Sequence, residues 1–144
     1  MRNLKLDDYG KILRASKLRD TAARRAVFEV LLDSDEPLSP SEIFKLAGCK
    51  PNLASVYRVL STFVEIALVK IVPRGFKPLY ELGDAFEPHH HHVVCEKCGK
   101  IVAVSDEKIE RIVRKVTIES GMEPTTHVIE LYGICAKCAA KQNA

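Results

Sequence analysis

Hydrophobic residues in the first half of the chain recur at helical spacing in three short segments. The first runs from Thr21, a residue type suited to an N-cap, to about Asp33. The second begins at Ser39-Pro40-Ser41-Glu42, a capping-box pattern with proline at the first helical position, and predicts a helix over roughly 40–47. The third follows Asn52 and carries an apolar face from Val56 to Phe63. The pattern therefore predicts three helices within residues 21–65.

Two β-rich stretches follow, Leu68–Val72 and Leu79–Leu82. The segment between them, Pro73–Pro78, contains glycine and two prolines and is typical of a hairpin loop. A helix, a turn, a second helix and a hairpin with a basic tip form the pattern of a winged helix. A small helical domain with a solvated charged face would give the same topology. Composition therefore has to distinguish a DNA-binding winged helix from such a domain.

The second half of the chain predicts a different architecture. An acidic, polar connector, Gly83–Pro88, leads to a strand over about 100–104, a helix over about 106–120 and a strand over about 126–132. The fold class expected is α+β, with a winged-helix domain at 1–82, a linker at 83–88 and an α/β domain at 89–144.

Length and composition fit one or two globular domains, because the 144 residues are 47% hydrophobic and 28% charged. No apolar run approaches the roughly 18 residues of a membrane span, and the N-terminus lacks the apolar core of a secretory signal. We expect a soluble, cytoplasmic protein without a membrane partner.

Charge favours a nucleic-acid partner for the first half. Residues 1–75 carry 13 basic and 9 acidic side chains, whereas residues 76–144 carry 9 and 10. The third predicted helix offers Ser55, Tyr57 and Arg58 on a polar face, where they can reach base edges and phosphates of double-stranded DNA. Lys70, Arg74 and Lys77 on the hairpin can contact backbone phosphates.

Cysteines are concentrated in the second half as two C-x2-C pairs, Cys95/Cys98 and Cys135/Cys138, separated by 36 residues. Two such turns can close a tetrahedral shell of four thiolates around Zn²⁺. Disulfides are disfavoured in a cytoplasmic chain, and a redox C-x2-C would not need duplication. Cys49 has no metal-binding neighbours and is interpreted as a small buried turn residue.

Four consecutive histidines, residues 89–92, precede the first cysteine pair. In an extended strand alternate residues point to opposite faces, so the run can supply two metal sites. The candidates for one site are His89, His91, Glu110 and His127. The candidates for the other are His90, His92 and Glu81, completed by Glu65 or, as a second choice, Glu36. A polar run with accidental metal affinity is the alternative.

Several motifs in order resemble the ferric uptake regulator (Fur) family of bacterial metal-sensing repressors. They are Leu18–Leu31, which contains Arg24; Leu53-Ala-Ser-Val-Tyr-Arg-Val-Leu60; Tyr80-Glu-Leu82; His90-His-His-Val-Val-Cys-Glu-Lys-Cys-Gly-Lys100; and Leu131-Tyr-Gly-Ile-Cys135. The resemblance implies a homodimer of winged-helix and α/β dimerisation domains that binds an AT-rich palindromic operator and represses metal-uptake genes when metal is bound.

The resemblance also implies roles for individual residues. Tyr57, Arg58 and Arg24 would contact DNA, and the four paired cysteines would hold a structural zinc ion. Glu81, His90 and His92 would belong to the regulatory site, and His89, His91, Glu110 and His127 to a second site beside the dimer interface. A metal bound to the regulatory residues would fix the angle between the domains and so select the DNA-binding conformation.

The sequence departs from the family pattern at Pro37, where a histidine ligand is common, and at His91, where iron sensors often have aspartate. These departures leave the metal open between iron, the first expectation, and zinc, with manganese also compatible. A zinc-responsive or peroxide-responsive regulator is the alternative within the family. A zinc hydrolase or deaminase is disfavoured, because paired cysteines leave no open coordination position and the deaminase motif is absent.

Overall fold

The structure is a computed structural model that describes residues 2–48, 50–74, 77–125 and 127–141. The chain forms two compact units, Met1–Pro88 and His89–Ala144. Cys49 and residues 75–76 of the predicted hairpin loop lie outside the described residues, as do the side chains of residues 73–77. No helix among the described residues is long and apolar enough to cross a membrane.

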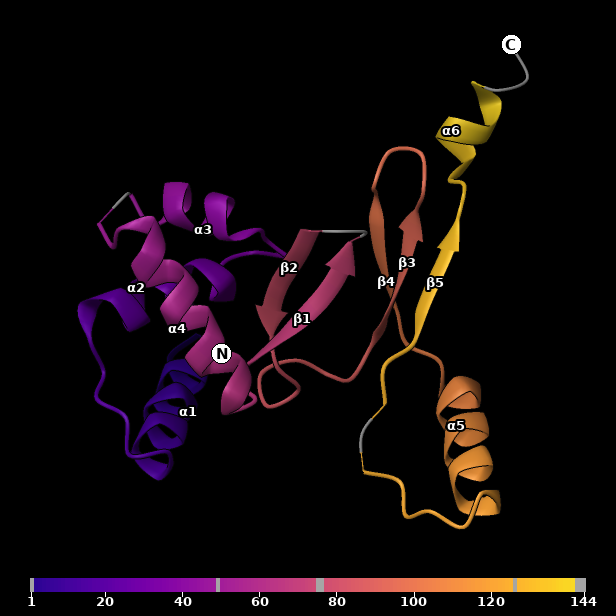
Figure 1. The fold of residues 1–144 in the computed structure, drawn as a ribbon, viewed down its shortest axis with the longest axis horizontal. Coiled ribbons are helices and arrows are strands. Elements are labelled where there is room, and N and C mark those ends of the chain that lie inside the picture. The colour runs from indigo at the N-terminus through magenta and orange to yellow at the C-terminus, as the bar shows by residue number, and fades with distance from the viewer. Residues whose placement is uncertain (1, 49, 75–76, 126, 142–144) are drawn as a thin grey trace. The chain divides into compact units, whose positions relative to one another are not determined.

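Helices make up most of the first unit (Figure 1). The three predicted N-caps are confirmed, because the side chains of Thr21, Ser39 and Asn52 each accept a hydrogen bond from a first-turn backbone N–H. Glu42 completes the capping box by accepting a hydrogen bond from the backbone N–H of Ser39. The helices are α1 (Arg2–Ala15), α2 (Ala22–Leu32), α3 (Pro40–Leu46) and α4 (Leu53–Glu65).

Helix α1 was missed by the sequence analysis, in which the first predicted helix begins at Thr21. Its apolar positions are sparse, but Tyr9 and Leu13 are fully buried. The Tyr9 ring stacks on Phe28 at 4.2 Å between centroids and meets Phe63 edge-on at 6.3 Å. The Tyr9 hydroxyl donates a hydrogen bond of 2.9 Å to Asp20, and burial together with this bond raises the pKa of Tyr9. Helix α1 is therefore part of the core.

The hairpin consists of β1 (Val69–Arg74) and β2 (Lys77–Leu82), which pair antiparallel from Val69 opposite Leu82 to Arg74 opposite Lys77. Both strands extend further into the predicted loop than expected. Leu38 adds an isolated bridge to Tyr80, so the segment before α3 runs beside β2. Helices followed by this hairpin confirm the winged-helix arrangement.

Residues 83–88, expected as a linker, pack on the first unit. The Phe86 ring is buried and meets Phe28 edge-on at 5.2 Å. The backbone N–H of Gly83 donates to the Leu68 carbonyl at 2.9 Å, and a Cβ at position 83 would lie 2.4 Å from the Ala67 carbonyl oxygen. Glycine is therefore required where the chain leaves the hairpin.

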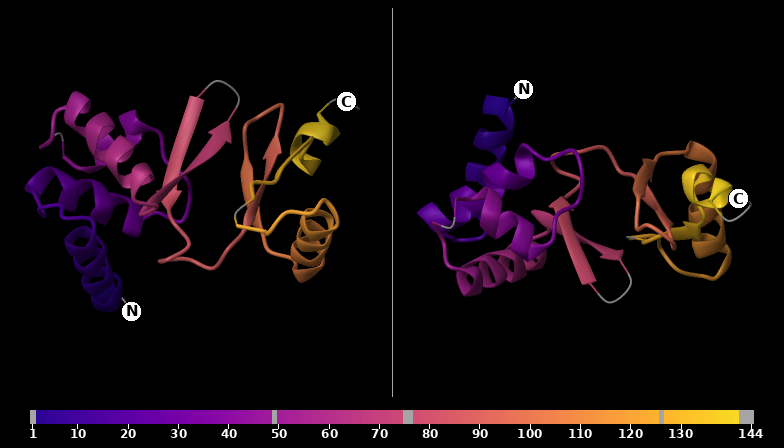
Figure 2. Two further views of the ribbon diagram at one scale, coloured as in Figure 1. Left: turned by 60° about the horizontal axis from the view of Figure 1, so that its bottom comes forward. Right: turned by 90° about the horizontal axis from the view of Figure 1, so that it is seen from above.

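A three-stranded sheet with strand order β4-β3-β5 organises the second unit (Figures 1 and 2). The central strand pairs antiparallel with β4 and parallel with β5. The predicted strand 126–132 is wrong at its start, because pairing begins only where Glu130 lies opposite His92. The elements are β3 (His91–Cys95), β4 (Ile101–Val104), α5 (Glu107–Glu119), β5 (Glu130–Gly133) and α6 (Ala136–Ala140).

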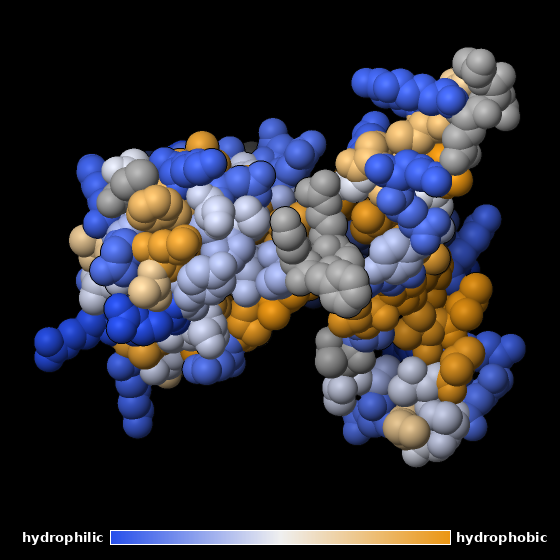
Figure 3. Space-filling view, turned by 45° about the horizontal axis from the view of Figure 1, so that its top comes forward, coloured by the Kyte–Doolittle hydropathy of each residue, from blue (hydrophilic) through white to orange (hydrophobic). Residues whose placement is uncertain are grey.

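The second unit buries little apolar surface within one chain. Val94 and Cys95 are its only buried hydrophobic residues among those described, and α5 buries none. Hydrophobic residues remain on its surface, as the space-filling view illustrates (Figure 3). They include Ile112, Val116, Val128, Leu131 and Tyr132. This unit therefore depends on something other than its own apolar core.

Candidate metal centres and nucleic-acid interface

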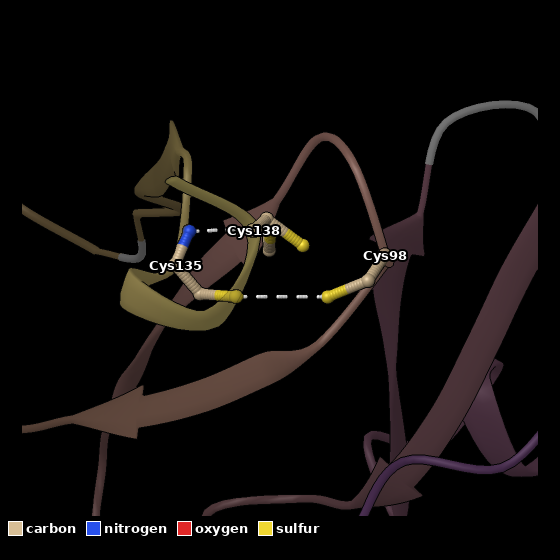
Figure 4. Close-up of side chains that lie close together, drawn as sticks. Cys98, Cys135 and Cys138 are labelled. Atoms are coloured by element: carbon tan, nitrogen blue, oxygen red, sulfur yellow. Dashed lines mark hydrogen bonds between the residues drawn. The ribbon is translucent and has the colours of Figure 1, made fainter. Parts of the chain in front are cut away.

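The four paired cysteines meet at one end of the sheet in the second unit. Figure 4 shows three of them, Cys98, Cys135 and Cys138. Cys95 ends β3 and Cys98 lies in the turn before β4, where the Gly99 N–H donates to the Cys95 carbonyl at 2.7 Å. Cys135 and Cys138 lie at the start of α6, where the Cys138 N–H donates to the Cys135 carbonyl at 2.9 Å. Two separate turns therefore present four sulfur atoms to one point.

The spacing of the sulfur atoms fits zinc. The Sγ atoms of Cys98 and Cys135 lie 3.8 Å apart, and all four lie within 4.8 Å of one another. A tetrahedral Zn²⁺ with Zn–S bonds of about 2.3 Å requires sulfur atoms about 3.8 Å apart. The four cysteines are not joined by disulfides. The residues therefore fit a four-thiolate zinc site.

Local charge supports the same assignment. The backbone N–H of Cys135 donates to Cys95 Sγ at 3.3 Å and, with other backbone donors, lowers the pKa of the Cys95 thiol to about 6. Hydrogen bonds with the other thiols raise the pKa of Cys138, because neighbouring sulfurs favour its protonated form. Four thiolates can coexist here only with a cation between them.

A second group, also within the second unit, comprises three histidines and one carboxylate. His91 Nε2 lies 2.8 Å from Glu110 Oε1, and His127 Nε2 lies 3.2 Å from Glu110 Oε2. His89 Nε2 lies 3.1 Å from His127 Nε2 and 3.7 Å from Glu110 Oε1. These distances bring together the four residues that the sequence analysis grouped.

The surroundings of this group suit a divalent cation. His91 is buried, whereas Glu110 on the first turns of α5 is 40% exposed and gives solvent access. The hydrogen bond with His91 lowers the pKa of Glu110, and the nearby imidazoles lower it further. A cavity of about 580 Å³ beside the group is bordered by Glu110, His127, Arg114 and Met122. The donor set, three imidazoles and a carboxylate, is one that Zn²⁺ and iron both accept.

The remaining predicted metal ligands belong to both units. In the second unit, the His90 and His92 rings have centroids 4.9 Å apart, on the face of β3 opposite to His91. In the first unit, Glu81 is a buried residue of β2. Glu81 and Glu36 line one small cavity in this unit, whereas Glu65 is exposed at the end of α4. Of the two candidate partners, Glu36 is the one placed beside Glu81.

Helix α4 presents the predicted DNA-contacting residues. Arg58 and Tyr57 are exposed, Tyr57 by 51%, whereas the opposite face of the helix is buried. The Arg58 guanidinium donates to Ser55 Oγ at 3.2 Å, so Ser55 orients Arg58 near the start of the helix. This geometry suits insertion of the helix into a major groove.

Arg24 has a structural partner that the sequence did not predict. Its guanidinium donates to the Arg19 carbonyl at 2.6 Å and so ties α2 to the segment before it. Arg24 therefore shapes the α1–α2 connection in addition to its predicted DNA contact. Arg74 ends β1, but its side chain lies outside the described part of the chain.

Comparison with known proteins decides the family. A family model described as the ferric uptake regulator family matches residues 15–132, which is most of the chain. The chain belongs to the ferric uptake regulator family. It is 33% identical over 139 residues to the ferric uptake regulation protein of Campylobacter jejuni, a match that covers 92% of this chain and 87% of the relative.

Solved structures of the ferric uptake regulator family agree with this fold. The Pseudomonas aeruginosa ferric uptake regulator, solved with manganese, superposes with a TM-score of 0.77 at 27% identity and covers 88% of this chain and 97% of its own. The Francisella tularensis ferric uptake regulator, solved with iron, gives 0.72 at 25% identity and covers 85% of this chain and 95% of its own. The resemblance inferred from the motifs is confirmed.

The ion pairs that Lys70 forms near Glu81 were not predicted from the sequence. Lys70 was considered only as a phosphate contact, but it contacts Glu81 and Asp84. The signal was present, because the predicted strands already place Lys70 opposite Glu81 in a hairpin.

Proposed function

We propose that this protein is a metal-dependent transcriptional repressor that binds double-stranded operator DNA as a homodimer and controls metal-uptake genes. The observation that carries the proposal is the combination, within a ferric uptake regulator fold, of an exposed Arg58 on a capped helix with two preformed groups of metal-binding side chains. Proteins of this kind regulate transcription, and no catalytic role is proposed.

The DNA contacts proposed are Arg24, Ser55, Tyr57, Arg58 and Arg74. An exposed guanidinium near the N-terminal part of α4 can reach guanine edges or phosphates, and Tyr57 can add apolar contact with thymine. The operator proposed is a palindrome, because a two-fold symmetric dimer presents two such helices to two half-sites. Its AT-rich composition is what the family resemblance implies.

The homodimer is supported by the exposed apolar surface of the second unit. Helix α5 is amphipathic but buries none of its residues, and β5 pairs only with β3 among the described strands. A second copy can cover this face and extend the sheet at β5. Formation of the dimer would then supply the apolar core that one chain lacks.

We assign three metal roles. The four cysteines hold structural zinc, and His89, His91, Glu110 and His127 hold a second ion. His90 and His92 with Glu81 bind the regulatory ion, as the family resemblance implies, and Glu36 replaces Glu65 as the preferred further ligand because it shares a cavity with Glu81. A cytoplasmic location, which four unpaired cysteines at zinc-like distances favour, belongs to this proposal.

Iron(II) is the proposed regulatory metal, because relatives are ferric uptake regulation proteins and mixed imidazole and carboxylate ligands suit it. A zinc-responsive regulator is the second candidate. It is favoured by His91, because this residue makes the second group a set of three imidazoles and one carboxylate. The ligand atoms lie 2.8–3.2 Å apart in the pairs His91–Glu110, His89–His127 and His127–Glu110, close enough to share one tetrahedral Zn²⁺.

Operator-binding titrations test the proposal. Protein that retains its cysteine-bound zinc but lacks other metals is compared with protein loaded with Fe²⁺, Mn²⁺ or Zn²⁺, using an AT-rich palindrome and a scrambled duplex of equal composition. We expect tight, sequence-specific binding only with the regulatory metal. Equal affinity in the stripped and loaded states would overturn the metal-dependent function, and the metal that acts at the lowest free concentration identifies the signal.

A further inference from the structure

Lys70 forms a bridge between two carboxylates of the hairpin region. It lies directly opposite Glu81 in the register of β1 and β2. Its Nζ atom lies 3.2 Å from Glu81 Oε1 and 3.1 Å from Asp84 Oδ1. The Glu81 side chain is only 10% exposed, whereas Asp84 is 54% exposed. All three residues belong to the first unit, so the bridge is a property of that unit alone.

A buried carboxylate needs a nearby cation, because desolvation of an uncompensated charge is costly. The ammonium of Lys70, 3.2 Å from Glu81 Oε1, supplies such a cation. A divalent ion bound to Glu81 would approach the same carboxylate, and two cations at one poorly solvated carboxylate repel each other strongly. Binding of the ion therefore requires Lys70 to withdraw from Glu81.

Asp84 makes that withdrawal feasible. It already accepts a hydrogen bond from Lys70 Nζ and lies at the surface, where water solvates both charges. The ammonium can therefore keep one carboxylate partner after it leaves Glu81.

We propose that Lys70 competes with the regulatory metal for the carboxylate of Glu81. The Lys70 ammonium must be displaced before the metal can bind, and it therefore sets the metal concentration at which the protein responds. This inference rests on the proposed role of Glu81 as a regulatory ligand. It assigns to Lys70 a function in setting the metal threshold, separate from the phosphate contact expected of a basic residue on the hairpin.

Metal affinity measured without DNA tests the proposal. Full-length protein with its cysteine-bound zinc is titrated with Mn²⁺, and free Mn²⁺ is followed by electron paramagnetic resonance. All variants carry Glu110→Ala, which disables the second group, so that the remaining Mn²⁺ binding reports on the regulatory site. Lys70→Met removes the charge and keeps the aliphatic stem, and Lys70→Thr provides a second neutral variant suited to a strand if the first does not fold.

We expect either neutral variant to tighten Mn²⁺ binding at least about fivefold, the lower end of typical coupling between sites. Lys70→Arg keeps the charge and should retain the parental affinity. Lys45→Met removes one charge from an exposed position on α3 and serves as the matched control, with affinity unchanged. In a Glu81→Gln background, Lys70→Met should have no effect, because the contested carboxylate is gone.

The outcomes separate the two proposals. Unchanged or weaker Mn²⁺ binding in folded Lys70→Met, together with weaker binding in Glu81→Gln, overturns the role of Lys70 and leaves the regulatory site intact. Unchanged binding in Glu81→Gln removes Glu81 from the site, and the proposed regulatory ligand set and this inference then fail together.

Discussion

Loss of one cysteine ligand should unfold the second unit and leave the first unit folded. Cys98 is the best position for the test, because its side chain is exposed and Cys98→Ser removes a sulfur without removing packing. Lys97→Ser, at the adjacent exposed position, is the matched control.

The expected size of the effect follows from the sparse core of this unit. Val94 and Cys95 are the only buried hydrophobic residues described in it. Because Cys95 is itself a zinc ligand, only Val94 counts as apolar burial, which contributes about 1.5–3 kcal/mol, whereas a structural Zn²⁺ site contributes about 10–16 kcal/mol at neutral pH. Zinc is therefore the larger stabilising contribution, and apolar burial within one chain cannot replace it.

Hydrogen exchange with mass spectrometry provides the assay, and elemental analysis gives the zinc content. In Cys98→Ser we expect zinc loss, rapid amide exchange in β3, β4 and β5, and a shift from dimer to monomer in sedimentation. Amides of α2 and α4 should keep their protection, because the core of the first unit is complete without metal. Zinc-free protein whose β3 amides exchange as slowly as in the parent would refute this reasoning.

Three further predictions concern the first unit. Arg58→Ala should weaken operator binding by about 1–3 kcal/mol, measured by mobility shift; parental binding would exclude α4 as the recognition helix. Tyr9→Phe removes the hydrogen bond to Asp20 and should cost about 1 kcal/mol at neutral pH in urea unfolding. Folding raises the pKa of Tyr9 above its ordinary value near 10. The contribution of the Tyr9 hydroxyl to the free energy of unfolding is therefore fully present below pH 10 and is lost as the pH rises further. The stability difference between parent and Tyr9→Phe should therefore shrink above that pH, and a constant difference would contradict the assignment. Gly83→Ala should destabilise the unit by about 1–3 kcal/mol, because the added Cβ meets the Ala67 carbonyl, and an unchanged urea midpoint would show that the backbone accommodates it.

Local signals were sufficient for much of the fold. Thr21, Ser39 and Asn52 cap helices that begin where the sequence predicts, and Asp106 caps α5 in the same way. Capping depends on one side chain and the next three residues, so it can be read from sequence alone. The grouping of His89 with His91 could also be predicted from the sequence, because side chains alternate along any strand.

The failures involve contacts that are distant in sequence. Helix α1 has two buried residues among charged neighbours, and its position depends on Phe28 and Phe63. Strand β5 starts late because its pairing with β3 begins at Glu130, a limit that no local pattern reveals. The choice between Glu65 and Glu36 stays a prediction, and the cavity that Glu36 shares with Glu81 is a contact that the sequence does not reveal.

The central position of β3 has a genetic consequence for the histidine run. Both neighbouring strands hold β3 in place, through Val93 opposite Val102 and Leu131, so its alignment is set downstream of the histidines. Deletion of any one of the four histidine codons gives the same protein, with proline moved into position 89. Such a lesion would leave three imidazoles, at positions 90–92, and remove one donor from the group around Glu110. Codon loss anywhere in the run would therefore always damage the same metal centre.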